Sequence, residues 1–134
     1  MTLKEIENYC LLKTGSFLDF PFGMDVAVIK VKSPSQEKGR IFAQLLILQG
    51  IPKVTLSCDA IIGEIWRANY PCSVERGYHC PKVQQPYFNT VTLTPNSTPS
   101  DDVLMEMIDH AYETTIGKMP KKYRKELEGF VAAL

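Results

Sequence analysis

The sequence has no excess of charge of either sign and no long apolar run. Its 134 residues contain 15 lysines and arginines against 15 aspartates and glutamates, so no overall field concentrates nucleic acid or anionic lipid around the chain. The longest apolar stretch, residues 41–48, is interrupted by Gln44 and is far shorter than the roughly 20 residues that span a bilayer. We therefore expect no membrane partner, and any binding of anions must depend on a local patch.

Cysteine is scarce, and its spacing excludes the familiar metal and redox motifs. The four residues Cys10, Cys58, Cys72 and Cys80 form no CxxC pair and no zinc-finger pattern. Residues 1–7 lack the basic and apolar segments of a secretory signal, and the sequence has no Gly-rich phosphate loop, HExxH or GxSxG. These absences predict a cytoplasmic protein with free thiols, no cofactor and no metal, and they favour a binding protein over an enzyme.

The length and the 45% hydrophobic content predict one domain over residues 1–134, with a hydrophobic core. Thr2 and Glu5 form a capping box, Asp59 is a typical N-cap, and residues 98–101 form a capping box with proline at the first helical position. The predicted helices run from residue 3 to Gly15 and over 60–70 and 99–118, with a basic amphipathic helix over 120–134; the predicted strands cover 25–32, 40–48, 53–58 and 87–94.

This order, α-β-β-β-α-β-α plus a short C-terminal helix, is typical of an α+β fold in which an antiparallel sheet packs against flanking helices. In the third predicted strand Val54, Leu56 and Cys58 alternate with Thr55 and Ser57. The alternation predicts a sheet with one buried face and one polar face.

The irregular stretch after the second predicted helix gathers the side chains with the most varied chemistry. Arg76 and Lys82 can donate to phosphate, Tyr78 can stack on a base, and His79 is a donor that switches with pH. Loops carry function more often than strands do. The structural alternative is that Tyr78 and His79 cover the core with satisfied polar tips.

Three other groupings give weaker signals. A Cys/His nucleophilic pair would need a thiol beside His79 or His110, and nothing in the sequence orients one toward the other. The acidic stripe at residues 102, 106, 109 and 113 is typical of a solvated helix face rather than a cation site. The basic residues of 118–125 complement a helix C-terminus or contact an acidic partner. The apolar stripe behind them docks on the core or forms a dimer contact; it comprises Tyr123, Leu127, Phe130, Val131 and Leu134.

Six short motifs occur in one order along the chain. They are Phe20-Pro21-Phe22-Gly23, Leu56-Ser57-Cys58-Asp59, Tyr70-Pro71, Gly77-Tyr78-His79, Asn89-Thr90-Val91 and Met107-Ile108-Asp109-His110-Ala111-Tyr112. With this ordered set the chain resembles the bacterial MmcQ/YjbR family over roughly residues 1–125. The resemblance implies a CyaY-like α+β fold. The family is described as DNA-binding from a fold comparison with a double-wing arrangement, so the resemblance implies DNA as a partner.

The chain departs from the family pattern beside the loop. Relatives often read Pro-Gly-Tyr-His-Met-Asn-Lys and then His-Trp-Asn-Thr, where this chain has residues 76–82 and then Tyr87-Phe88-Asn89-Thr90. Phe88 replaces the tryptophan and Tyr87 the histidine, which keeps an aromatic platform. The same fold implies a frataxin-like iron carrier as a competitor, but on the first helix Lys4 and Lys13 dilute the two glutamates.

The leading hypothesis is nucleic-acid binding through the loop and the predicted hairpin. The residues assigned to it are Arg76, Tyr78, His79, Lys82 and Asn89, with Lys30, Lys32, Lys38 and Arg40 as the second contact. One alternative is a small-ligand pocket lined by Phe20, Phe22, Tyr78, His79 and Asn89. The other is a protein–protein adaptor, monomeric or weakly homodimeric, that associates through the C-terminal helix.

The balanced total charge conceals charge separation along the chain. Residues 101–117 contain five acidic residues and no lysine or arginine, whereas residues 118–125 contain five basic residues and no acidic one. Between residues 26 and 100 there are eight basic residues and four acidic ones. A local anion-binding face is therefore compatible with a neutral chain.

Overall fold

The structure, a computed structural model, describes residues 1–95 and 99–133, with side chains as far as residue 129. In these residues the helices are α1 (Leu3–Leu11), α2 (Ala60–Asn69), α3 (Asp101–Gly117) and α4 (Lys121–Ala133), with a short 3-10 helix η1 (Gln85–Tyr87). The strands are β1 (Ser16–Asp19), β2 (Ala27–Val31), β3 (Arg40–Leu48), β4 (Ile51–Ser57), β5 (Val74–Arg76) and β6 (Phe88–Thr92). No described helix combines the length and the hydropathy needed to cross a membrane.

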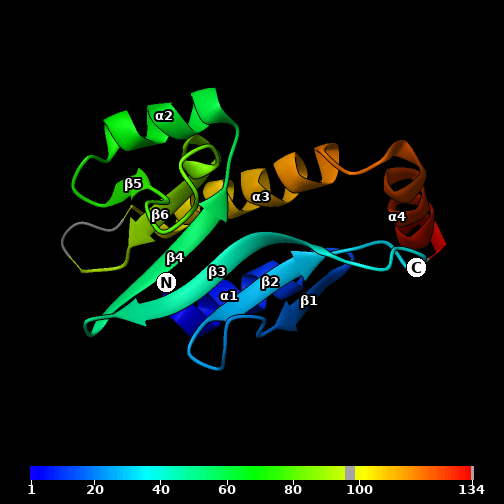
Figure 1. Cartoon of the computed structure of the whole chain (residues 1–134), viewed down its shortest axis with the longest axis horizontal. Helices are drawn as coiled ribbons and strands as arrows, with labels where there is room; N and C mark the ends of the chain where they lie inside the picture. The colour runs from blue at the N-terminus through cyan, green and yellow to red at the C-terminus, as the bar shows by residue number, and fades with distance from the viewer. Residues whose placement is uncertain (96–98, 134) are drawn as a thin grey trace.

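The described strands form one antiparallel sheet in the order β1-β2-β3-β4-β6-β5. Helices α1 and α3 lie against one side of this sheet, α2 lies beside β5, β6 and η1, and α4 stands at one end of the molecule (Figure 1). The predicted α+β class, with an antiparallel sheet and flanking helices, is confirmed.

Two strands were not predicted, and both are short edge strands. β1 falls in the segment between the first predicted helix and the first predicted strand, and β5 has only three residues. Such short segments show too few alternations to reveal a strand. The strands predicted over 40–48 and 53–58 correspond to β3 and β4.

The helix starts test the capping predictions. The capping box of Thr2 and Glu5 is confirmed, and the Asp59 carboxylate accepts from the backbone N–H groups of Ile61 and Ile62. The start predicted for the third helix is wrong, because α3 begins at Asp101 and is capped by Ser100, whose hydroxyl accepts from the Val103 N–H. Pro99 therefore precedes the helix, and Thr98 lies outside the described residues.

The first helix is also shorter than predicted. It ends at Leu11, and Gly15 follows in a left-handed conformation with φ 80°. A Cβ at Gly15 would lie 2.6 Å from the Lys32 carbonyl oxygen and 2.8 Å from Leu127 Cδ2. Gly15 is therefore required by close packing of the chain after α1, rather than by the end of the helix itself.

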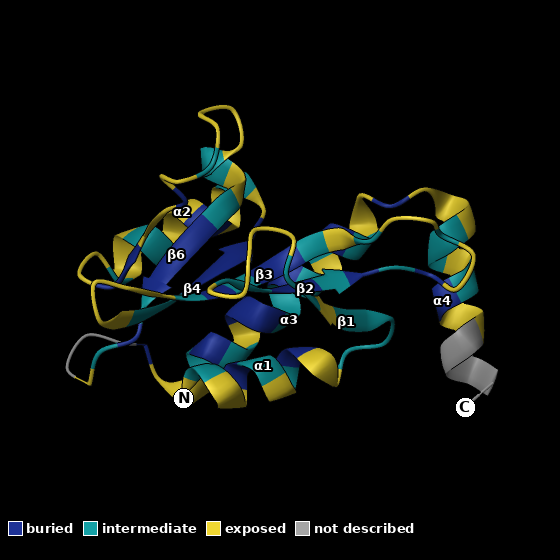
Figure 2. Cartoon of the chain, turned by 60° about the horizontal axis from the view of Figure 1, so that its bottom comes forward, coloured by how far each residue is buried: buried dark blue, intermediate teal, exposed yellow. Residues whose placement is uncertain are grey.

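The core lies between the sheet and helices α1 and α3, where buried residues gather in the middle of the molecule (Figure 2). Phe42 of β3 is fully buried and meets the edge of the Tyr112 ring in α3, with centroids 5.6 Å apart. The prediction of a polar sheet face is wrong for Thr55 and Ser57, since both are buried. Their hydroxyls are satisfied inside the protein, because Thr55 bonds Thr90 across the β4–β6 pair and Ser57 bonds α3.

Helix α4 packs on its own chain. Leu127 is buried against the segment after α1, and the Glu126 carboxylate accepts from the backbone N–H of Ser35 at 2.6 Å and from its hydroxyl. This contact ties α4 to the loop between β2 and β3. The apolar residues predicted at Phe130, Val131 and Leu134 lie outside the described side chains.

A histidine joins α2 to α3. The backbone N–H of Asp59 donates to His110 Nε2 at 2.9 Å, and the Trp66 ring lies edge-on to the imidazole, with centroids 5.0 Å apart. Burial lowers the pKa of His110, although the negative charges of Asp59 and Glu113 offset part of this effect. His110 is therefore neutral in the folded protein at neutral pH and serves as a hydrogen-bond acceptor.

The free energy of unfolding is expected to fall as the pH decreases through about 6.5, the usual pKa of histidine. In that range the unfolded chain binds a proton at His110 that the folded chain does not bind, so the stability present above this pH is lost below it. The variant His110→Gln keeps an acceptor but does not titrate, and it should lose less stability between about pH 7.5 and about pH 5.5. Urea unfolding of both proteins at the two pH values measures the difference; an equal loss in both would assign the effect to other groups.

Candidate functional site

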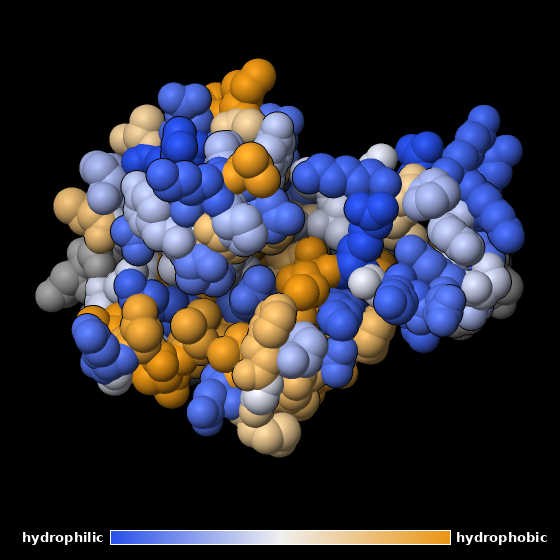
Figure 3. Space-filling model, in the orientation of Figure 1, coloured by the Kyte–Doolittle hydropathy of each residue, from blue (hydrophilic) through white to orange (hydrophobic). Residues whose placement is uncertain are grey.

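A groove opens where β3 begins, α3 ends and η1 meets β6. We call it the basic groove; its lining residues are Arg40, Ile41, Ser57, Gln84, Tyr87, Phe88, Thr115 and Lys118. Its volume is about 350 Å³. Figure 3 shows this face hollowed between η1 on one side and the end of α3 on the other, with hydrophilic side chains along the border.

The border of the basic groove carries two cations and an aromatic ring. Lys118 caps the C-terminus of α3, and its ammonium lies over the Tyr87 ring, 5.0 Å from the centroid. Arg40, the first residue of β3, is exposed and pairs with Val31 of β2 in the sheet register. Among the described lining residues no carboxylate offsets these charges. The groove is thus positively charged although the chain as a whole is neutral.

The floor of the basic groove is polar and already ordered. Ser57 Oγ donates to the Ala111 carbonyl at 3.0 Å and shares a hydrogen bond of 2.8 Å with Thr115 Oγ1. These contacts fix the end of β4 against α3. Because a hydroxyl oxygen has two lone pairs, the floor keeps acceptor capacity for a ligand.

The loop singled out in the sequence, residues 76–82, lies on the surface. In the sequence it comes just before η1, which borders the basic groove. Arg76 ends the edge strand β5, and Tyr78, His79 and Lys82 are all exposed. The loop is held by turns, with Cys80 N–H donating to the Gly77 carbonyl at 2.8 Å, and by the Gln85 amide, which donates to the Cys80 carbonyl at 3.1 Å. The alternative in which Tyr78 covers the core does not hold, since 65% of this residue is exposed.

The predicted hairpin cations have different surroundings. Lys30 forms an ion pair of 2.8 Å with Asp19 of β1, and Lys32 lies over the Phe17 ring, 5.5 Å from its centroid. Lys38 is exposed in the loop before β3. Of the four predicted hairpin residues, Arg40 is the one that lines the basic groove.

Asn89 is buried beneath α2. Its amide nitrogen donates to the Gly63 carbonyl at 3.1 Å, and its amide oxygen accepts from Arg67 at 2.6 Å. Both ends of the side chain are therefore engaged in holding α2 on β6.

The predicted small-ligand pocket is not assembled. Phe20 and Phe22 follow β1 at one edge of the sheet, whereas Tyr78 and His79 follow β5 at the opposite edge. Phe22 and Tyr78 are both largely exposed, at 63% and 65%, and Asn89 is engaged below α2. These residues do not converge on one concave site, because they lie at opposite edges of a six-stranded sheet.

Comparison with models of known protein families shows to which family the chain belongs. The model of the YjbR family matches residues 11–114. The chain belongs to the YjbR family. The resemblance drawn from the six ordered motifs is thereby confirmed.

Two solved structures are similar to this YjbR-family chain. A Deinococcus radiodurans protein with a DUF419 domain is 30% identical, with a TM-score of 0.81, over 95% of this chain and 88% of that one. A Pseudomonas syringae protein is 17% identical, with a TM-score of 0.66, over 86% of this chain and 99% of that one, and it supports the fold alone. No curated protein matches the chain.

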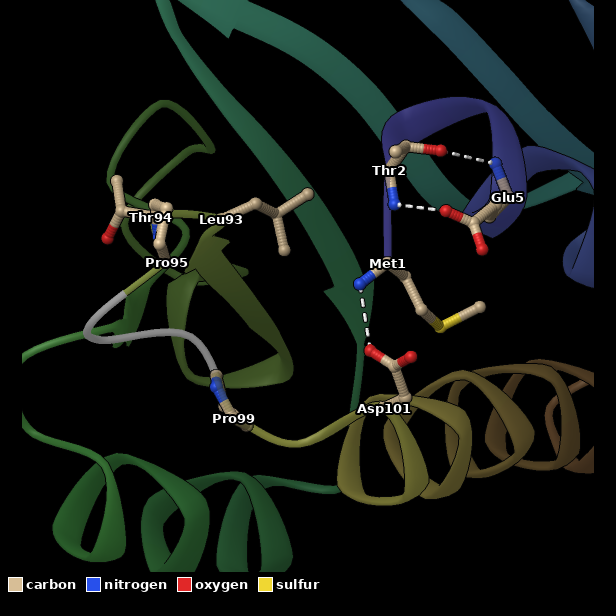
Figure 4. Close-up of a pocket in the computed structure, with 8 residues that line it drawn as sticks. All are labelled: Met1, Thr2, Glu5, Leu93, Thr94, Pro95, Pro99 and Asp101. Atoms are coloured by element: carbon tan, nitrogen blue, oxygen red, sulfur yellow. Dashed lines mark hydrogen bonds and ion pairs between the residues drawn. The ribbon is translucent and has the colours of Figure 1, made fainter.

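A second hollow in the YjbR-family chain lies between the start of α1, the end of β6 and the start of α3. Its volume is about 390 Å³, and it is lined by Met1, Thr2, Glu5, Leu93, Thr94, Pro95, Pro99 and Asp101 (Figure 4). Both of its carboxylates have partners: Asp101 accepts from the Met1 amino group, and Glu5 accepts from the Thr2 N–H, which lowers the pKa of Glu5. The described lining includes no aromatic ring, so this hollow offers less for recognition than the basic groove.

Burial disfavours ionisation of three thiols of the YjbR-family chain, those of Cys10, Cys58 and Cys80, by raising their pKa. Burial raises the pKa of Cys10 to about 12 and that of Cys58 to about 11. Among the described residues, no group of three or more His, Cys, Asp or Glu side chains is arranged to hold a metal ion. In the acidic stripe, Asp109 is engaged with Lys13 and with the Tyr9 hydroxyl.

Of the eight residues that line the basic groove, sequence reasoning assigned only Arg40 to a site, and it missed the second cation, Lys118, and the aromatic ring of Tyr87. Lys118 was interpreted mainly as a complement to the end of a helix, and Tyr87 as a substitution within the family pattern. Their side-chain chemistry could have identified them in the sequence, because Lys118 is a cation, Tyr87 is an aromatic residue, and each lies beside irregular backbone.

Proposed function

We propose that this YjbR-family protein binds nucleic acid through the basic groove. The observation that carries the proposal is that one groove brings together Arg40 and Lys118, from two distant parts of the chain, with the exposed Tyr87 ring, over which the Lys118 ammonium lies. Phosphates recognise such paired cations, and bases recognise such a ring. Recognition of this kind requires a local positive patch, and it does not require that the whole chain carry a net positive charge.

The proposal divides the residues predicted from the sequence into two groups. Lys38 and the loop residues Arg76, Tyr78, His79 and Lys82 are exposed and supply flanking contacts. Lys30 and Asn89 are assigned to the fold because each is engaged with another polar residue of the same chain, and Lys32 because it lies over Phe17, outside the basic groove. The adaptor alternative has less support, because Leu127 of α4 is buried against its own domain.

Affinity for nucleic acid is expected to decrease with salt between about 50 and about 200 mM. Replacing either Arg40 or Lys118 with alanine should weaken binding by about 5-fold to 8-fold near 0.1 M salt, because one phosphate contact is lost. The slope of log affinity against log salt should decrease in magnitude by about 0.7 to 0.9 for each variant. Fluorescence anisotropy with labelled oligonucleotides measures both quantities.

The matched control is Lys4→Ala, which removes an exposed cation on α1 that pairs with Glu7. It should change the affinity by less than about 2-fold, since the lysine lies outside the groove. A loss as large as that of the groove variants would show that charge alone, and not this site, determines binding.

A further inference from the structure

We propose that the basic groove receives an unpaired base, so that the protein prefers single-stranded nucleic acid to duplex. This inference rests on the proposed function above. The groove is a recess of about 350 Å³, which is the size of pockets that enclose a small organic ligand. A base within a duplex is stacked and paired, and it must leave the helix before it can enter such a recess.

Tyr87 provides the surface on which that base would stack. The residue is 43% exposed, and the Lys118 ammonium lies 5.0 Å from the centre of its ring. Stacking on an aromatic ring tolerates any base, because every base presents a flat π-surface. The Lys118 ammonium lies over one face of the ring, so a base stacked on the opposite face has a phosphate contact close by.

The interior of the groove matches the polar edge of a base. Ser57 and Thr115 place hydroxyl oxygens on the floor, and Gln84 lines the same groove with an amide. The hydrogens of both hydroxyls are engaged within the protein, so their oxygens can accept hydrogen bonds from the exposed edge of an unpaired base, while the Gln84 amide can donate and accept. In a duplex that edge is occupied by the complementary strand.

The shape of the site also disfavours duplex. Reading a duplex through its major groove requires a protein helix or ribbon that protrudes into it. Here Arg40 and Lys118 lie along the border of a recess. From that border the two cations reach phosphates of a strand whose base has entered the recess.

The test compares a labelled oligothymidylate of about 15 nucleotides with a duplex of the same length, by anisotropy at low salt. The native protein should bind the single strand at least about 10-fold more tightly than the duplex. Tyr87→Ala should weaken single-strand binding by about 5-fold to 150-fold and duplex binding by less than about 2-fold. Tyr87→Phe keeps the ring and should bind the single strand within about 2-fold of the native protein. Thermal melting of each variant, followed by circular dichroism, verifies that it is folded.

The outcomes separate the two proposals. Equal affinity for single strand and duplex, or an equal loss of both in Tyr87→Ala, overturns the single-strand preference while leaving nucleic-acid binding intact. Absence of binding to either oligonucleotide at low salt overturns the proposed function itself. If Tyr87→Ala does not fold, Tyr87→Leu keeps apolar bulk without the ring and provides the same comparison.

Discussion

Replacing Phe42 with alanine is expected to lower the free energy of unfolding by about 3 to 5 kcal/mol. Phe42, the third residue of β3, is fully buried, and its ring meets Tyr112 of α3 edge to face. The substitution removes apolar surface from the core and leaves a cavity that a close-packed interior cannot fill by relaxation. Urea unfolding measures the loss of free energy, and thermal unfolding should show a decrease in melting temperature of about 10 to 20 °C.

The matched control for this prediction is Phe22→Ala. Phe22 is 63% exposed in the turn after β1, so its loss should change stability by less than about 0.5 kcal/mol. A destabilisation of less than about 1 kcal/mol in Phe42→Ala would contradict the placement of the core between β3 and α3.

Replacing Asn89 with alanine is expected to cost about 2 to 4 kcal/mol in stability, a large effect for one polar side chain. Asn89 is buried and bridges two partners, accepting from Arg67 at 2.6 Å and donating to the Gly63 carbonyl at 3.1 Å. Its removal leaves a guanidinium and a backbone carbonyl without that partner beneath α2. Chemical unfolding measures the loss.

The same variant distinguishes a structural Asn89 from a ligand-binding one. Asn8→Ala, at an exposed position of α1, serves as the matched control and should change stability by less than about 0.5 kcal/mol. If Asn89 acts only in the fold, the folded fraction of Asn89→Ala should bind nucleic acid within about 2-fold of the native protein. A stable Asn89→Ala that has lost binding would assign the residue to the site instead.

Local chemistry explains which parts of the fold were predictable. The capping box at Thr2 and the N-cap at Asp59 act within one helical turn, so a few neighbouring residues determine them. The strand β3 was predicted over its full length because seven of its nine residues are apolar and turn residues bound it. By contrast, two residues close together, Thr98 and Ser100, are both suitable N-caps for α3, and sequence alone does not decide between them.

The candidate site was predictable only in part, because it is assembled from four separated segments. Residues 40–41, 57, 84–88 and 115–118 meet only after the sheet and α3 have packed together. Lys30 and Arg40 look alike in the sequence, as cations on one hairpin. The sheet register brings Lys30 beside Asp19 of β1, whereas Arg40 borders the groove. Whether a cation has an acidic partner depends on residues that are close in space but distant in the sequence. The local sequence pattern does not contain this information.

The tie between α4 and the loop before β3 has a consequence for the thermodynamics of recognition. Glu126 binds Ser35, and within the loop the Ser33 N–H donates to the Gln36 side chain while the Gln36 N–H donates to the Ser33 carbonyl. A segment already ordered in the free protein loses little conformational entropy when a ligand reaches Arg40 at its end. Ligand binding at the groove can therefore proceed with little rearrangement of backbone, and its free energy is not reduced by the cost of ordering this loop.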